Sequence, residues 1–247
     1  MLSSRDQSGQ SRFPQTRWSL VVGAQGDVEH SPPARLALHE LCGLYWRPLY
    51  SFIRRSGYQK EDAEDLTQEF LAQVIHKRQL ERAEQDKGKL RSFLLAYLKH
   101  FLADERKAAR AQKRGGDREK VSIDHEDAES RYQAEIADAA TPDVLFEKAW
   151  ALTLLELVLS KLEVDYRKDG KGELFTALKS TLQWAGDEST MATIASRLGM
   201  QEGAVKVAAY RLRQRYRQAL RQEVTFTLAD GEQVDEEMRY LFQVLSG

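Results

Sequence analysis

Cysteine, proline and long apolar runs are all scarce in this chain of 247 residues. A single cysteine, Cys42, excludes an internal disulfide and gives no cysteine-based metal cluster. Five prolines leave room for long helices, and no apolar run approaches the roughly 20 residues that span a bilayer. Residues 1–12 lack the apolar core of a signal peptide. We therefore expect a cytoplasmic, mainly helical protein with no membrane segment.

The overall charge is close to neutral, but its distribution is not. Lys and Arg number 37 against 38 Asp and Glu, which gives a net charge of −1. Taken as a whole, that balance argues against a nucleic-acid binder. The charges are segregated in blocks along the chain, however, so single segments are strongly acidic or strongly basic. The blocks indicate separate binding surfaces of opposite sign.

The clearest local pattern lies between residues 190 and 220. A short apolar-periodic segment ends at Gly199, and a second helical run begins near Gln201. Between Gly203 and Arg221 this second run carries six basic residues and no acidic one. Two helices, a glycine turn and a basic second helix predict a DNA-binding helix-turn-helix. The alternative is an ordinary helical hairpin with a solvated basic face.

An acidic helix is expected over residues 58–80. Five of the ten residues from Glu61 to Phe70 are acidic. Asp62, Asp65 and Glu69 are spaced so that they form an acidic ridge beside the apolar stripe. Such a ridge would repel DNA phosphates. It is either a solvated surface or a binding surface for a basic protein.

A basic, aromatic helix is expected over residues 89–114. From Lys89 to Arg118 there are nine basic residues and three acidic ones. Cations for the backbone and flat rings for unstacked bases are what a single-stranded nucleic-acid site requires. Most of the aromatic residues are also at the spacing of a helix core, so the alternative is that they are buried.

The remaining segments complete an all-α fold of two helical domains joined by an acidic linker. Between Ser122 and Glu147 eight acidic residues accompany one base, Arg131, which predicts a solvated tether or a segment held along a basic channel. The second domain should begin at Thr141–Pro142 and form a helix-turn-helix bundle. Pro48 predicts a kink or break in the helix before Gly57.

The expected organisation has five parts. They are an N-terminal extension (1–30), a first helical domain (31–114), the acidic linker (115–141), the helix-turn-helix domain (142–221) and a C-terminal extension (222–247). The last part holds six acidic residues and one basic residue, Arg239. Its helix from Val234 to Leu245 should turn Met238, Leu241, Phe242 and Leu245 inward. We expect this extension to cover the basic helix or to dock on the first domain.

Three motifs in this order resemble bacterial RNA polymerase sigma factors of the extracytoplasmic-function type (group IV). They are LYWRPLYSFIRRSGY at 44–58, EDAEDLTQEF at 61–70, and MATIASRLGMQEGAVK with YRLR within 191–213. The resemblance covers about residues 36–220. It implies a non-catalytic specificity subunit whose domains 31–114 and 142–221 correspond to sigma regions 2 and 4. The implied partners are core RNA polymerase, promoter DNA and an anti-sigma factor, with no cofactor and no metal.

The resemblance also implies a role for individual residues. Those implied to bind core polymerase are Asp62, Asp65, Gln68 and Glu69. Those implied to recognise and open the minus-ten element are Arg91, Phe93, Tyr97, Lys99, His100, Asp104, Arg106, Lys107 and Arg110. Those implied to read the minus-thirty-five element are Gln201, Glu202, Gly203, Lys206, Tyr210, Arg211 and Arg213. Phe93 and His100 stand where the family usually has Trp and Asn.

Two other function classes compete with this hypothesis. A free-standing helix-turn-helix regulator would bind an operator as a dimer, but it requires neither the acidic nor the basic aromatic helix. A nuclease with a DNA-binding tail would need paired carboxylates. Asp104 and Glu105 are adjacent and diverge on a helix, which disfavours an enzyme.

Overall fold

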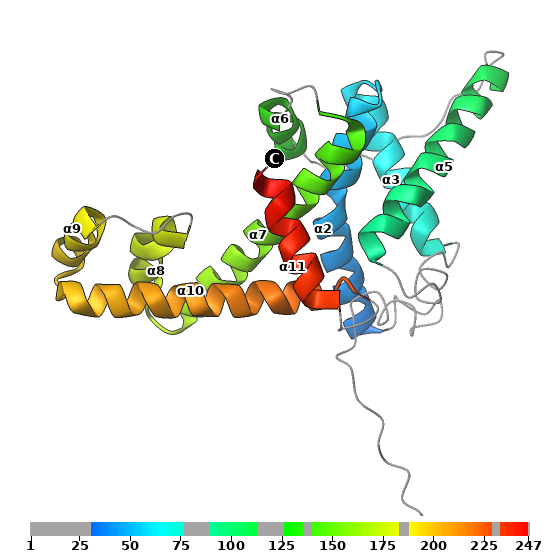
Figure 1. The fold of residues 1–247 in the computed structure, drawn as a ribbon. Helices are drawn as coiled ribbons and strands as arrows, with labels where there is room; N and C mark the ends of the chain where they lie inside the picture. Colours follow the sequence, from blue (N-terminus) through cyan, green and yellow to red (C-terminus); the bar gives the residue numbers. More distant parts are fainter. Residues whose placement is uncertain are drawn as a thin grey trace, which may run out of the picture.

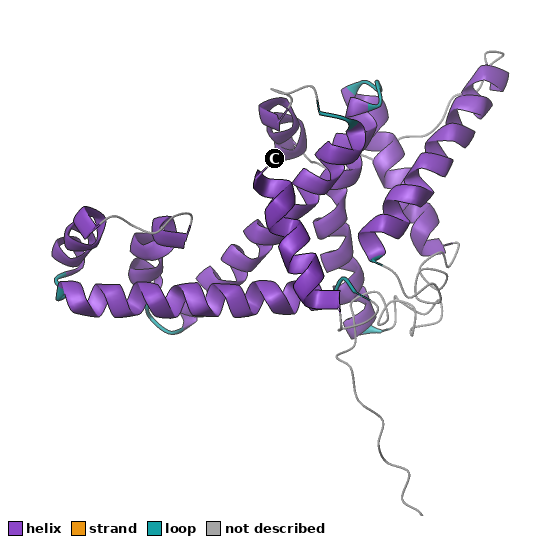
Figure 2. Ribbon diagram, in the orientation of Figure 1, coloured by secondary structure: helices purple, strands orange, loops and turns teal. Residues whose placement is uncertain are grey.

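The structure, a computed structural model, describes residues 31–76, 89–112, 126–135, 140–182, 188–228 and 233–246. This part of the chain is helical, apart from one isolated antiparallel bridge between Lys89 and Leu228 (Figure 2). The predicted all-α class is confirmed. The predicted N-terminal extension, residues 1–30, lies outside the described residues. Of the helices described, none is long and apolar enough to cross a bilayer.

The helices follow one another along the chain as Figure 1 labels them. They are α2 (Pro32–Arg55), α3 (Lys60–His76), α5 (Leu90–Gln112), α6 (Glu126–Glu135), α7 (Pro142–Lys168), α8 (Gly172–Leu178), the 3-10 turn η1 (Lys179–Leu182), α9 (Glu188–Leu198), α10 (Glu202–Thr225) and α11 (Val234–Ser246).

Helix α2 begins at a proline and ends at a glycine, as the sequence predicts. Pro32 occupies the first turn, where its missing N–H costs nothing. Gly57 then adopts a φ of 99° just beyond the helix. The break expected at Pro48 does not occur, because α2 continues through this buried residue. Packing on both sides of Pro48 supports the helix across the one backbone hydrogen bond that proline cannot donate.

The centre of the molecule is the contact between α2 and α7. Tyr45 and Leu49 of α2 and Phe146, Trp150 and Leu154 of α7 are almost completely buried. They belong to one hydrophobic cluster that also receives side chains from α3, α5, α10 and α11. The segments predicted as two domains are therefore in direct contact through their longest apolar faces. Burial of this area is the main favourable contribution to the fold.

Part of the predicted linker is a docked helix, α6. Tyr132 is buried against Tyr50 of α2, with the two rings edge to face at 6.3 Å. Glu129 accepts two hydrogen bonds from Arg54, at 2.9 and 2.8 Å, and a third from the Tyr50 hydroxyl. The prediction of a solvated tether is thus wrong for these residues. A low apolar content concealed the helix, because its attachment is largely ionic and aromatic.

The turn between α9 and α10 has the predicted geometry. Gly199 has a φ of 61°, in the left-handed region that favours glycine. The Met200 amide donates to the Ala195 carbonyl at 3.0 Å and so closes the end of α9. Helix α10 then runs for 24 residues. Figure 1 shows its first turns beside α9 at one end of the molecule and its last turns beside α11 near the centre.

The C-terminal extension docks on the rest of the protein through α11. Its buried residues are Val234, Glu237 and Leu241, and they contact α7 and α10. The prediction that Phe242 faces inward is wrong, since this ring is 52% exposed. The buried stripe is rotated toward Glu237, because that carboxylate has cationic partners inside the molecule. The extension thus contacts the predicted second domain through α7 and α10, and the predicted first domain through the ion pairs of Glu237 with Lys89 and Arg91.

We predict that the attachment of α6 is lost in acid. Glu129 is held mainly by its hydrogen bond from Arg54, and its pKa is lowered from 4.5 to about 2. A lowered folded-state pKa stabilises the protein above about pH 4.5, and this contribution disappears as the pH falls toward 2. Glu129→Gln should therefore destabilise the protein by about 1.5–3 kcal/mol at pH 7 and by progressively less below pH 4.5.

Urea unfolding of the wild type and the variant between pH 7 and pH 3 measures this difference. Glu163→Gln is the matched control, since Glu163 pairs with the well-exposed Arg167 on the surface of α7. A difference between wild type and Glu129→Gln that does not change with pH would contradict the assignment.

Candidate functional site

Helix α3 presents its predicted acidic ridge away from the core. Ala63, Thr67 and Phe70 form the completely buried side of the helix. On the other side Asp62 is exposed, and Asp65, Gln68 and Glu69 are half-buried. Gln73 donates to Glu69 at 3.4 Å along the same helix. The ridge keeps carboxylates at the surface, where a cationic partner could reach them.

An open groove of about 790 Å³ lies beside this ridge. Gln68, Leu71 and Ile75 of α3 form one wall, and residues of α2, α6 and α7 form the rest. The floor includes Gly43 of α2, where an added Cβ would meet no atom within 4 Å. The predicted polymerase-binding residue Gln68 therefore borders both the acidic ridge and a largely apolar hollow.

Helix α5 divides its predicted minus-ten residues between its packed face and its surface. The rings of Phe93 and Tyr97 stack on each other with centroids 6.2 Å apart, and Tyr97 also packs on Phe70 of α3. Both are half-buried, so the interpretation of these rings as core residues holds in part. Lys99 and His100 are exposed, and Lys99 forms an ion pair with Asp143 of α7.

The far end of α5 is more open. Asp104 and Lys107 are both exposed and form an ion pair at 3.1 Å. Arg106 donates to the Ser56 carbonyl at 3.2 Å, and its guanidinium lies over the Tyr58 ring at 5.5 Å. The side chain of Arg110 lies outside the described residues. These side chains therefore form a polar surface with mixed charges.

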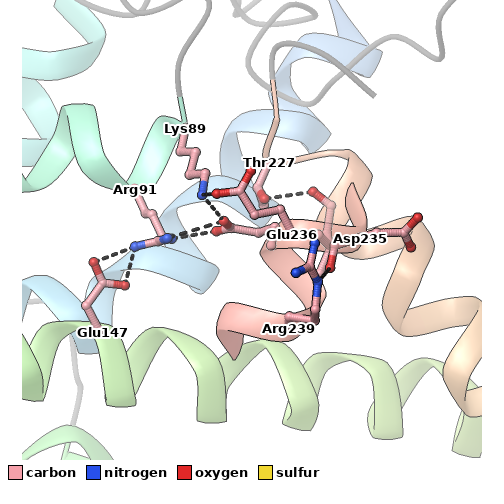
Figure 3. A network of polar contacts seen from close by, with 9 residues as sticks. Lys89, Arg91, Glu147, Thr227, Asp235, Glu236 and Arg239 are labelled. Atoms are coloured by element: carbon pink, nitrogen blue, oxygen red, sulfur yellow. Dashed lines mark hydrogen bonds and ion pairs between the residues drawn. The ribbon is translucent and has the colours of Figure 1, made fainter. Parts of the chain in front are cut away.

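Arg91 differs from the other predicted minus-ten residues because it is buried. Only 5% of it is exposed. Its guanidinium donates to Glu237 of α11 at 2.6 and 3.3 Å and to both carboxylate oxygens of Glu147 of α7 (Figure 3). It also lies over the rings of Trp150 and Tyr240, at 5.0 and 4.2 Å. In this conformation Arg91 is not available to a DNA phosphate.

The Arg91 network shifts the titration of its members. Burial would lower the pKa of Arg91, but its hydrogen bond to Glu237 and the two neighbouring carboxylates raise that pKa above its ordinary value. Burial would raise the pKa of Glu237, yet the hydrogen bonds from Arg91 and Lys89 hold it below its ordinary value. Burial raises the pKa of Glu147 in spite of Arg91. The network thus favours the charged forms of Arg91 and Glu237, whereas burial disfavours the charged form of Glu147.

The first half of α10 is an exposed surface. Val205, Ala209 and Leu212 face the core. The opposite side carries exposed residues from Gln201 to Arg211, with Val207 and Tyr210 exposed by 49% and 60%. The predicted minus-thirty-five residues on this surface are Gln201, Glu202, Gly203, Lys206, Tyr210 and Arg211.

Two of the predicted minus-thirty-five cations on α10 have partners within the chain. Lys206 pairs with Glu202 one turn earlier, at 2.8 Å. Arg213 is half-buried and donates to the Thr181 carbonyl at 3.2 Å. Arg213 therefore also attaches α10 to η1, whereas Arg211 and Tyr210 project from the surface.

The burial of Arg91 was not predicted from the sequence, although a signal was available. Arg91 precedes the buried Leu94 and Leu98 by three and seven residues, which places it on the apolar stripe of α5. Glu237 follows Val234 by three residues and precedes Leu241 by four, which places it on the apolar stripe of α11. A charged residue on each of two apolar stripes is the pattern of a buried ion pair.

Comparisons of the chain with protein-family models, curated proteins and solved structures find no match. Within the described residues, no three His, Cys, Asp or Glu side chains gather closely enough to hold a metal ion. A function for this protein is therefore inferred from its own surfaces.

We predict that Arg91 and Lys99, two turns apart on α5, contribute very differently to stability. Arg91→Ala should lower the free energy of unfolding by about 3–5 kcal/mol, because it leaves the largely buried Glu147 carboxylate without its cation. Lys99→Ala removes one cation from a surface ion pair and should cost about 0–1 kcal/mol. Urea unfolding followed by circular dichroism measures both. Equal losses would contradict a structural role for Arg91.

Proposed function

We propose that this protein is a sigma factor, which binds core RNA polymerase and directs promoter recognition and DNA opening. The observation that carries the proposal is the separation of two charged surfaces on one helical scaffold. The acidic ridge of α3 and the exposed first half of α10 lie at opposite ends of the molecule (Figure 1). A protein that must contact an enzyme and DNA at the same time needs such a separation.

The surface of α10 supports contact with duplex DNA. A helix that follows a tight turn and projects its first turns outward can enter the major groove. Here Gln201, Lys206 and Arg211 offer an amide and two cations, and Tyr210 offers an exposed ring. Amide and guanidinium groups read base edges, while cations anchor the helix to phosphates. In this proposal α9 and α10 form the helix-turn-helix that reads the minus-thirty-five element.

The surface of α3 supports contact with a basic protein. Its exposed and half-buried carboxylates line one side of a helix whose other side is fixed in the core. Like charges make this ridge a poor DNA surface and a good partner for a cationic coiled coil or loop. We assign the ridge to the clamp of core polymerase, in line with the resemblance of EDAEDLTQEF to the family motif.

Helix α5 would then meet the minus-ten element. Its outer surface offers Lys99, His100 and Lys107, and its aromatic rings lie just beneath. Unstacking a base pair step costs a few kcal/mol, and stacking a captured base on an aromatic ring returns roughly 1–3 kcal/mol. DNA opening on this helix therefore needs no nucleotide hydrolysis, and the proposed role is not enzymatic.

Run-off transcription on a library of genomic fragments tests the proposal. We expect specific transcripts when the chain and core polymerase are combined, and none with either alone. The chain alone should bind promoter duplex weakly, because each half offers few contacts until core polymerase holds both on one scaffold. Tight operator binding without core polymerase, and no transcripts with it, would instead favour a free-standing helix-turn-helix regulator.

We further predict that charge reversal on α3 abolishes polymerase binding. Asp65→Arg with Glu69→Arg should weaken core affinity at least about tenfold, because two attractive contacts become repulsive. Asp165→Arg is the matched control, since Asp165 is an exposed acid at the far end of α7. Both proteins should keep the wild-type circular dichroism spectrum. Unchanged core affinity in the double variant, measured by fluorescence anisotropy, would contradict the assignment of the ridge.

A further inference from the structure

The start of α5 is bound to the C-terminal extension by three kinds of contact. Lys89 pairs with Leu228 in an antiparallel bridge, and the Leu90 amide donates to the Thr227 carbonyl at 3.3 Å. Lys89 and Arg91 both contact the carboxylate of Glu237, at 2.8 and 2.6 Å. Thr227, Leu228 and Glu237 thus hold the first turn of the helix to which we assign DNA opening.

The contact with Glu237 has the form of an anion site. Arg91 places two N–H groups on the carboxylate, and the Lys89 ammonium reaches the same group. The Tyr240 ring lies beneath both cations, at 4.2 and 5.9 Å. A guanidinium fork binds a carboxylate and a phosphate with the same bidentate geometry. A DNA phosphate is therefore a chemical substitute for the Glu237 side chain at this position.

We propose that residues 226–228 and α11 form a releasable inhibitory segment, in which Glu237 occupies a phosphate-binding position at the start of α5. The inhibition of DNA opening rests on the function proposed above. In the closed protein Lys89 and Arg91 form ion pairs with Glu237 of α11. Helix α11 also holds the end of α10 near α5. Release of α11 exposes both cations and frees α5 from α10. Promoter DNA then replaces one anionic ligand with another.

The structure favours release of α11 over other openings. Three residues of α11 are buried, Val234, Glu237 and Leu241, whereas α2 and α7 share the large apolar centre of the fold. The other side of α11 is exposed, including Glu236 and Phe242. The ion pair between Arg221 of α10 and Asp235 of α11 lies at the surface and contributes little. Detaching α11 therefore exposes little apolar area compared with separating α2 from α7.

A reversible disulfide tests whether the segment must leave. Antiparallel bridge partners have Cα atoms roughly 4.5–5.5 Å apart, within the range that a disulfide spans. Lys89→Cys with Leu228→Cys, in a Cys42→Ala background, should therefore link the segment to α5 on oxidation. We expect the oxidised protein to bind core polymerase like the reduced one. It should form promoter complexes at least about tenfold more weakly, and reductant should restore them.

The outcomes separate the two proposals. If the wild type forms no promoter complex with core polymerase, the proposed function fails. If the wild type and the reduced variant form complexes and the oxidised variant forms them equally well, the inhibitory segment alone is overturned. Because the oxidised and reduced states share one sequence, the loss of Lys89 and Leu228 side chains affects both equally.

Neutralising Glu237 gives a second, independent measurement. The probe is a fluorescein-labelled single-stranded DNA of 20 mixed nucleotides, without polymerase. Glu237→Gln should bind it on the order of fivefold more tightly, with a log–log salt slope steeper by about 0.7 for one added phosphate contact. Glu236→Gln, which changes the exposed neighbour 3.9 Å from Lys89, should have a much smaller effect. A folded Glu237→Gln protein with wild-type affinity and slope would overturn the proposal.

Discussion

The burial of one guanidinium, that of Arg91, constrains how the helices of this protein meet. A cation removed from water costs several kcal/mol unless carboxylates and hydrogen bonds replace the solvent. Here the replacement comes from α7 and α11, which supply Glu147 and Glu237. Helix α5 is therefore held in the closed protein by both of these helices. One charged side chain thereby makes the predicted first domain, second domain and C-terminal extension depend on each other.

The same principle accounts for much of the charge segregation along the chain. The acidic linker is predicted from the sequence to be a solvated tether or a segment held along a basic channel, and the acidic C-terminal extension is predicted to cover the basic helix or to dock on the first domain. In the structure Glu129 of α6 forms an ion pair with Arg54 of α2, and Glu237 of α11 forms ion pairs with Arg91 and Lys89. These acids are counter-charges for cations far away in the chain. What remains exposed is acidic on α3 and, on α10, mixed and rich in cations, so neutral overall charge coexists with two distinct surfaces.

For this protein the sequence predicts where helices begin and end better than it predicts how the helices pack on one another. Apolar periodicity located most of the helices, and the ends at Gly57, Pro142 and Gly199 follow from backbone chemistry that acts within a few residues. Apolar periodicity did not predict α6, because a single buried aromatic ring does not make a periodic pattern. It also predicted Phe242 to be buried, whereas this side chain is exposed. The burial of Arg91 depends on a partner 146 residues away. Spacing can place each charged residue on an apolar stripe, but it does not show which two helices meet.

Helix α10 is a rigid connection between the end of the molecule that carries α9 and the centre, where α11 lies. At about 1.5 Å per residue its 24 residues extend roughly 36 Å without interruption. Its first turns carry the exposed surface beyond α9, and its last turns contact α7 and α11. A helix without a proline or an internal glycine beyond its first turn moves as one body. The direction in which α10 presents Lys206 and Arg211 is therefore set by how its other end packs on α7 and α11. The surfaces of α5 and α10 consequently have one fixed relative orientation while α11 is attached.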